Sequence, residues 1–159
     1  KLISILKKVL LDFFNEEINN KINNKYNIKF VGDRNFLSNE INIKIDQLQN
    51  KKTNSKKYLI IYLNYSGKED IRNAAYKYHL NLNKKKRKLS FDNFLSLNNI
   101  PDPDILIRTG GFKRLSDFII FQTTFTELFF INKLWPQLKK KDIFNILNKY
   151  SLIERKFGL

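Results

Sequence analysis

Residues 101–111 read Pro101-Asp102-Pro103-Asp104-Ile105-Leu106-Ile107-Arg108-Thr109-Gly110-Gly111, and this stretch decides the fold class. Its two prolines have no amide hydrogen, so 101–104 is predicted to be a rigid turn. The apolar run 105–107 is typical of a strand buried on both faces, as in a parallel sheet covered by helices. The glycine pair 110–111 then predicts a loop at the carboxyl end of that strand.

Strand patterns and helix patterns alternate along the rest of the chain. Short apolar runs predict further strands, and apolar residues at helical spacing predict helices. The predicted strands are 28–31, 58–63, 105–107, 118–121 and 128–131, with 58–63 also buried on both faces. The predicted helices are 2–23, one capped by Ser38, one following Gly67, a short one capped by Ser90, and a closing helix at 139–156. This alternation predicts an α/β fold with a mainly parallel sheet covered by helices, as a single domain over residues 1–159.

The composition limits the classes of function. The chain has no cysteine, which excludes disulfides, zinc–thiolate sites and thiol catalysis. No apolar run reaches the roughly 18 to 20 residues of a membrane-spanning helix, and no signal peptide is visible, so a cytoplasmic protein is expected. The formal net charge of +15 suits a polyanionic partner, but lysine-rich and asparagine-rich coding bias is the favoured explanation. The basic run 84–88 is most simply a solvated loop.

The loop from Arg108 to Asp117 concentrates groups that bind phosphate. It holds two of the six arginines of the chain, Arg108 and Arg114, together with a glycine pair and the hydroxyl of Ser116. Guanidinium groups make two-pronged hydrogen bonds to phosphate oxygens. The residues leave two interpretations open: phosphate binding, or a structural network of ion pairs with Asp102, Asp104 or Asp117.

Glu127 lies in the apolar stretch 125–130. A carboxylate there is costly to bury unless it is paired or binds a metal, so a salt bridge and a metal site are both open. His79, the single histidine, is expected to have a surface or packing role.

These motifs resemble those of the cis-prenyltransferases, a family that includes undecaprenyl diphosphate synthase and dehydrodolichyl diphosphate synthase. The segments that match in order and spacing are 101–111, 114–118, 121–122, 127–128 and 134–136. Weaker matches at 32–34, 64–68 and 154–158 extend the similarity over essentially the whole chain.

The resemblance implies a reaction and its ligands. The reaction would be sequential cis-condensation of isopentenyl diphosphate onto an allylic diphosphate such as farnesyl diphosphate, assisted by Mg²⁺. By resemblance, Arg108, Arg114 and Ser116 would bind the diphosphate of isopentenyl diphosphate, and Glu127 would help to bind Mg²⁺. No nucleic-acid partner is implied, and the lipid product implies a peripheral membrane contact.

The tail resembles an element that serves a partner subunit. Arg155, Lys156 and Gly158 would belong to the Arg-x-Gly element that reaches the other active site of a homodimer. The family's catalytic Asp-Gly-Asn motif and its first strands have no counterpart in residues 1–159. No catalytic residue is therefore assigned, and the chain is expected to be the C-terminal two-thirds of a family member. A non-catalytic or degraded subunit and a basic nucleic-acid-binding module are the alternatives.

Overall fold

The computed structural model describes residues 2–14, 25–51, 53–82 and 89–156. The chain forms two compact units, 1–65 and 66–159. Each unit holds one pair of parallel strands, together with helices, so the α/β class with parallel strands is confirmed. Within the described residues, no helix is long and apolar enough to cross a membrane.

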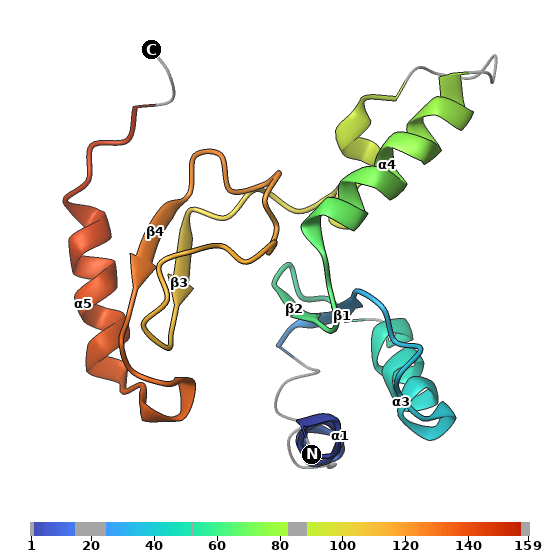
Figure 1. The fold of residues 1–159 in the computed structure, drawn as a ribbon, viewed down its shortest axis with the longest axis horizontal. Coiled ribbons are helices and arrows are strands. Elements are labelled where there is room, and N and C mark those ends of the chain that lie inside the picture. The colour runs from blue at the N-terminus through green and yellow to red at the C-terminus, as the bar shows by residue number, and fades with distance from the viewer. Residues whose placement is uncertain (1, 15–24, 52, 83–88, 157–159) are drawn as a thin grey trace. The chain divides into compact units, whose positions relative to one another are not determined.

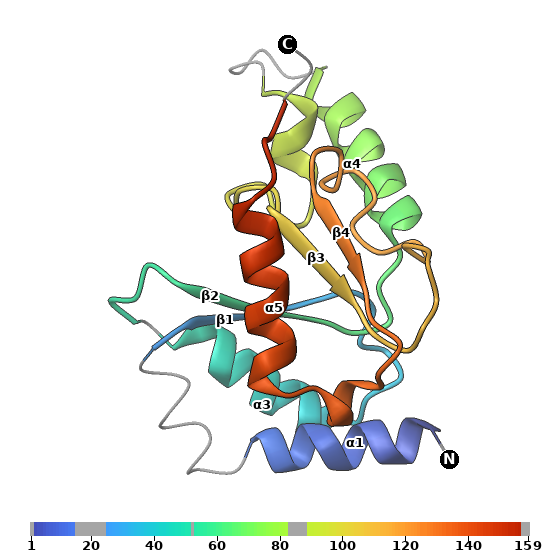
Figure 2. The same ribbon diagram turned by 90° about the vertical axis from the view of Figure 1, so that its left-hand side faces the viewer.

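The first unit is built on strands β1 (Asn27–Val31) and β2 (Tyr58–Tyr62), which lie side by side in Figures 1 and 2. Both strands confirm predictions. The burial predicted for both faces of 58–63 is only partial: Leu59 and Ile61 pack on the core, whereas on the other face Ile60 and Tyr62 are half-buried and Tyr58 is exposed. The core of this unit therefore covers one face of the strand pair.

Two helices supply the rest of that core, α1 (Leu2–Phe13) and α3 (Asn39–Asn50). Helix α3 begins after Ser38, as predicted, and its buried residues are Ile41, Ile45 and Leu48. Their spacing places them on one stripe of the helix. Helix α1 confirms the start of the helix predicted at 2–23, and residues 15–24 lie outside the described part.

The second unit contains strands β3 (Ile105–Arg108) and β4 (Glu127–Phe130), paired in parallel. The short helix η1 (Phe91–Phe94) packs against helix α4 (Gly67–Leu82), where Tyr78 makes edge contacts with both phenylalanines of η1. Helix α5 (Lys140–Ser151) lies alongside the strand pair (Figures 1 and 2), after a second short helix, η2 (Trp135–Gln137).

One predicted element of this unit was wrong, and one predicted helix ends earlier than expected. Residues 118–121 form turns rather than a strand, and Ile119 has a φ of 36°, which an extended strand does not allow. The closing helix is confirmed over Lys140–Ser151 and ends five residues before 156; beyond its end, Arg155 bonds to Asp104 and Phe125. The basic run 84–88 lies outside the described residues.

Candidate functional site

The glycine pair after β3 connects two neighbouring loops. Gly110 and Gly111 have φ values of 88° and 81°, in the left-handed region that favours glycine. Their amides donate to the carbonyl oxygens of Lys133 (2.9 Å) and Ile131 (3.0 Å), which follow β4. These bonds fix the start of the arginine loop at the carboxyl end of the strand pair, where open α/β sheets bind their ligands.

The loop brings the three predicted diphosphate ligands together. Arg108 Nη1 donates to Ser116 Oγ at 2.8 Å, and Arg114 Nε donates to the same oxygen at 3.2 Å. Arg108 also donates to the carbonyl oxygen of Arg114. Arg108, Arg114 and Ser116, called the clamp below, therefore form one cluster, although the residues are up to eight positions apart.

Phe112 provides a platform for both guanidinium groups. Its ring centroid lies 4.5 Å from Arg114 Cζ and 5.9 Å from Arg108 Cζ. The electron-rich face of an aromatic ring attracts a cation at such distances. The sequence analysis missed this role, although an aromatic residue between two arginines is the signal that could have shown it.

The clamp cations are not neutralised by acidic neighbours. In the described ranges, neither guanidinium lies within ion-pair distance of a carboxylate. Asp104 pairs with Arg155, and Asp117 bonds to Ser66 and to the amide of Lys68. The alternative of a structural ion-pair network is therefore wrong, and the clamp offers two charged forks to an anion.

Asp117 joins the clamp loop to helix α4. Its carboxylate accepts hydrogen bonds from Ser66 Oγ (2.5 Å) and from the amide of Lys68 (2.9 Å). These two bonds, the Ser66 bond first, hold the pKa of Asp117 below its ordinary value. Ser66 Oγ also accepts the amide hydrogen of Glu69 at 3.1 Å, as in a helix cap. The Ser-x-x-Glu pattern at 66–69 indicates the start of this helix, but not its bonds to Asp117.

Glu127 does not lie with the clamp. It pairs with Ile105 at the amino end of β4, whereas Arg108 pairs with Phe130 at the other end. The separation is three residues, about 10 Å, and an odd spacing directs the two side chains to opposite faces. Glu127 instead lines a cavity of about 230 Å³ with Arg155 and Lys156.

The described residues do not by themselves form a magnesium site. They contain no cluster of three histidine, cysteine, aspartate or glutamate side chains that could hold a metal ion. Mg²⁺ prefers hard oxygen ligands, and two neighbouring cations oppose its binding beside Glu127. No chemical step is therefore assigned to a metal here, and Glu127 stays a predicted ligand.

The tail residue Arg155 is bound to its own unit. It donates to the carboxylate of Asp104, to the hydroxyl of Tyr150 (3.1 Å) and to the carbonyl oxygen of Phe125 (3.1 Å). The bond to Asp104 is the main cause that raises the pKa of Arg155 above its ordinary value. Lys156 is exposed, and Gly158 lies outside the described residues.

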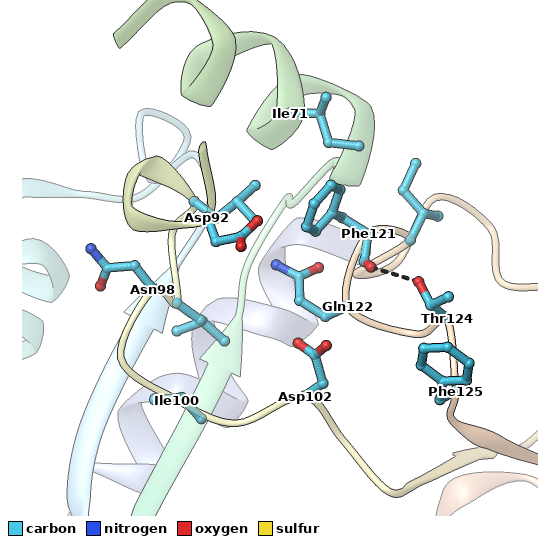
Figure 3. A pocket seen from close by; sticks show the side chains of 12 residues that line it. Ile71, Asp92, Asn98, Ile100, Asp102, Phe121, Gln122, Thr124 and Phe125 are labelled. Carbon is cyan, nitrogen blue, oxygen red and sulfur yellow. Dashed lines mark hydrogen bonds between the residues drawn. The ribbon is translucent and has the colours of Figure 1, made fainter. Parts of the chain in front are cut away.

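A cavity of about 600 Å³ lies beside the turn 119–125, and Figure 3 shows the side chains around it. Apolar residues such as Ile71 and Phe121 share its wall with the carboxylates of Asp92 and Asp102. Gln122 also lines it, and no described group bonds to its buried Oε1. The clamp residues are not among those that line this cavity.

A parallel α/β fold with a cationic loop at the carboxyl end of a strand defines a class of proteins that bind phosphorylated ligands. A family model described as "Putative undecaprenyl diphosphate synthase" matches residues 1–158. The tritrans,polycis-undecaprenyl-diphosphate synthase (geranylgeranyl-diphosphate specific) of Pyrobaculum aerophilum is 34% identical over an alignment of 137 positions, which covers 82% of this chain and 57% of that protein. The isoprenyl transferase of Chlorobaculum tepidum is 30% identical over an alignment of 165 positions, which covers 98% of this chain and 62% of that protein.

A solved structure shows the same relationship. The crystal structure of lavandulyl diphosphate synthase from Lavandula x intermedia, in complex with dimethylallyl diphosphate, matches with a TM-score of 0.83 at 26% identity, covering 99% of this chain and 71% of that one. The chain therefore belongs to the cis-prenyltransferase family, as the motif resemblance implied. It spans 57% and 62% of the length of the Pyrobaculum and Chlorobaculum proteins.

Proposed function

We propose that this chain acts in prenyl transfer, in which isopentenyl diphosphate condenses repeatedly, with cis geometry, onto an allylic diphosphate such as farnesyl diphosphate. The observation that carries the proposal is the clamp, in which two guanidinium groups without carboxylate partners share the hydroxyl of Ser116. Family membership supplies the reaction, and the clamp supplies a binding site for the diphosphate of isopentenyl diphosphate.

The clamp groups would act by holding charge in place. Arg114 keeps its two Nη groups without a described partner, so both can donate to one phosphate. Ser116 Oγ uses its lone pairs on the two arginines and can donate its own hydrogen. Fixed donors of this kind, aimed at a charged oxygen, contribute on the order of 2 to 4 kcal/mol each to transition-state stabilisation.

The rest of the proposal follows the family. By the family resemblance, Glu127 would be one ligand of a bound Mg²⁺, which would supply charge neutralisation for the departing allylic diphosphate. The tail with Arg155, Lys156 and Gly158 would serve the partner subunit of a homodimer. The chain would form one domain in the cytoplasm, with peripheral membrane contact through its lipid product.

The test is transfer of labelled isopentenyl diphosphate into lipid-soluble product, with farnesyl diphosphate and Mg²⁺, by the purified full-length protein that contains residues 1–159. We expect R114A to lower the rate about a hundredfold, as loss of one such donor does. The control R72A removes an exposed arginine that pairs with Glu69 on α4, and should stay within twofold. A chain that binds isopentenyl diphosphate without transferring it contradicts the proposed activity and supports the non-catalytic subunit.

A further inference from the structure

The turn that carries Ser116 is fastened to the first turn of α4. The carboxylate of Asp117 accepts the Ser66 hydroxyl at 2.5 Å and the Lys68 amide at 2.9 Å. The carbonyl oxygen of Asp117 accepts the amide hydrogen of Gly67 at 2.7 Å. Three hydrogen bonds thus connect one loop residue to three consecutive residues that begin the helix.

The backbone at this turn needs such support. Ser116 and Asp117 have φ values of 50° and 64°, in the left-handed region that non-glycine residues rarely adopt. Two consecutive residues in this conformation persist only where the surrounding structure holds them. The three bonds from Asp117 to the start of α4 supply that restraint.

The approach of the helix also depends on Gly67. A Cβ atom on Gly67 would lie 2.9 Å from the carbonyl oxygen of Asp117 and 3.0 Å from Ile120 Cγ1. Such contacts are closer than a side-chain carbon normally makes. The sequence Ser66-Gly67 therefore gives the turn both its hydroxyl partner and the space to reach it.

The position of the turn decides the geometry of the clamp. Ser116 Oγ is the shared acceptor for Arg108 and Arg114, at 2.8 and 3.2 Å. A shift of about 1 Å would break both bonds, because they weaken steeply beyond about 3.5 Å. The orientation of both guanidinium groups therefore depends on Asp117, although its side chain bonds to Ser66 and Lys68 and not to either arginine.

We propose that Asp117 is a positioning residue of the diphosphate clamp: by bonding to the first turn of α4 it places Ser116 Oγ between Arg108 and Arg114. The inference rests on the proposed function, since it assumes that the clamp binds a diphosphate. Asp117 itself touches no ligand in this scheme and acts through Ser116.

The experiment measures the dissociation constant of inorganic pyrophosphate by calorimetry, for the chain and for three variants, D117A, D117N and D142A. D117A should weaken binding at least tenfold. D117N should stay within threefold, because the amide can accept from Lys68 and donate to Ser66. The matched control is D142A, which removes another aspartate that accepts an amide hydrogen at the start of a helix, that of Lys139 just before α5. It should lose a similar amount of thermal stability and keep its affinity.

A double-mutant cycle separates positioning from general stability. If Asp117 acts through Ser116, D117A made in the S116A background should weaken binding no further than about twofold. An equal loss in both backgrounds, or D117A binding as tightly as the unmodified chain, overturns the positioning role and leaves the proposed function intact. Failure of the unmodified chain to bind pyrophosphate overturns both. If D117A does not fold, S66A replaces it, because S66A removes only one of the three bonds between Asp117 and the start of α4. S66A should then weaken pyrophosphate binding severalfold.

Discussion

The guanidinium group of Arg114 lies over the ring of Phe112, with Cζ 4.5 Å from the ring centroid. In this chain the platform is uncharged, and it orients Arg114 without neutralising it. The charge of the clamp is therefore kept for an anionic ligand.

We expect F112A to weaken pyrophosphate binding about three- to tenfold, because each exposed cation–π contact contributes about 0.5 to 1 kcal/mol. The measurement is the dissociation constant in low salt. F144A is the matched control, since Phe144 is a similarly exposed phenylalanine on α5. Equal affinity of F112A and F144A would show that the ring does not orient the clamp.

Glu127 provides a test that separates metal binding from the clamp. Because it lies at the opposite end of β4 from the clamp, E127Q should leave pyrophosphate binding in EDTA unchanged within twofold. If Glu127 is a metal ligand, the same variant should raise the Mg²⁺ concentration needed for half-maximal prenyl transfer. Loss of binding in EDTA would contradict the separation of Glu127 from the clamp.

Acid should destabilise the second unit through two aspartates. The Ser66 hydroxyl lowers the pKa of Asp117, and the Lys133 ammonium lowers the pKa of Asp142. A carboxyl group whose pKa is lower in the folded state than its value of about 3.8 in the unfolded state stabilises the fold at any pH above 3.8. That stabilisation is lost as the pH falls through the folded-state pKa. The melting temperature should therefore drop below about pH 4, and less steeply in D117N/D142N. Parallel curves for the variant and the unmodified chain would refute this cause.

Local sequence signals predicted most of the strands and helices, because they rest on neighbouring residues. Apolar runs marked β3 and β4, and apolar spacing with Ser38 marked α3. The run 118–121 misled, since a short apolar segment fits a strand and a buried turn equally well. The turn is set by the left-handed backbone at 116, 117 and 119. None of these residues is a glycine, so the sequence does not indicate that conformation.

The composition of the clamp could be predicted from the sequence, and its support could not. Arg108, Arg114 and Ser116 share one loop, so their proximity follows from the strand before them. The bond between Asp117 and Ser66 spans 51 positions, and a single sequence carries no sign of such a pairing. Glu127 is instructive because the predicted strand 128–131 begins just after it, which already places it at the amino end, away from the ligand side of a parallel sheet.

Gly32 allows a test of whether the two units unfold together. It follows β1 with a φ of 112°, and a Cβ there would lie 2.0 Å from the carbonyl oxygen of Leu63. Strain and overpacking together should make G32A cost about 2 to 4 kcal/mol of the free energy of unfolding. G110A is the control, since Gly110 also has a positive φ (88°) but the nearest atom would be 4.0 Å away, and it should cost about 1 kcal/mol.

If residues 1–159 form one domain, calorimetry of G32A should show a single transition shifted to lower temperature. Two transitions, of which only one moves, would show instead that 1–65 and 66–159 are separate folding units.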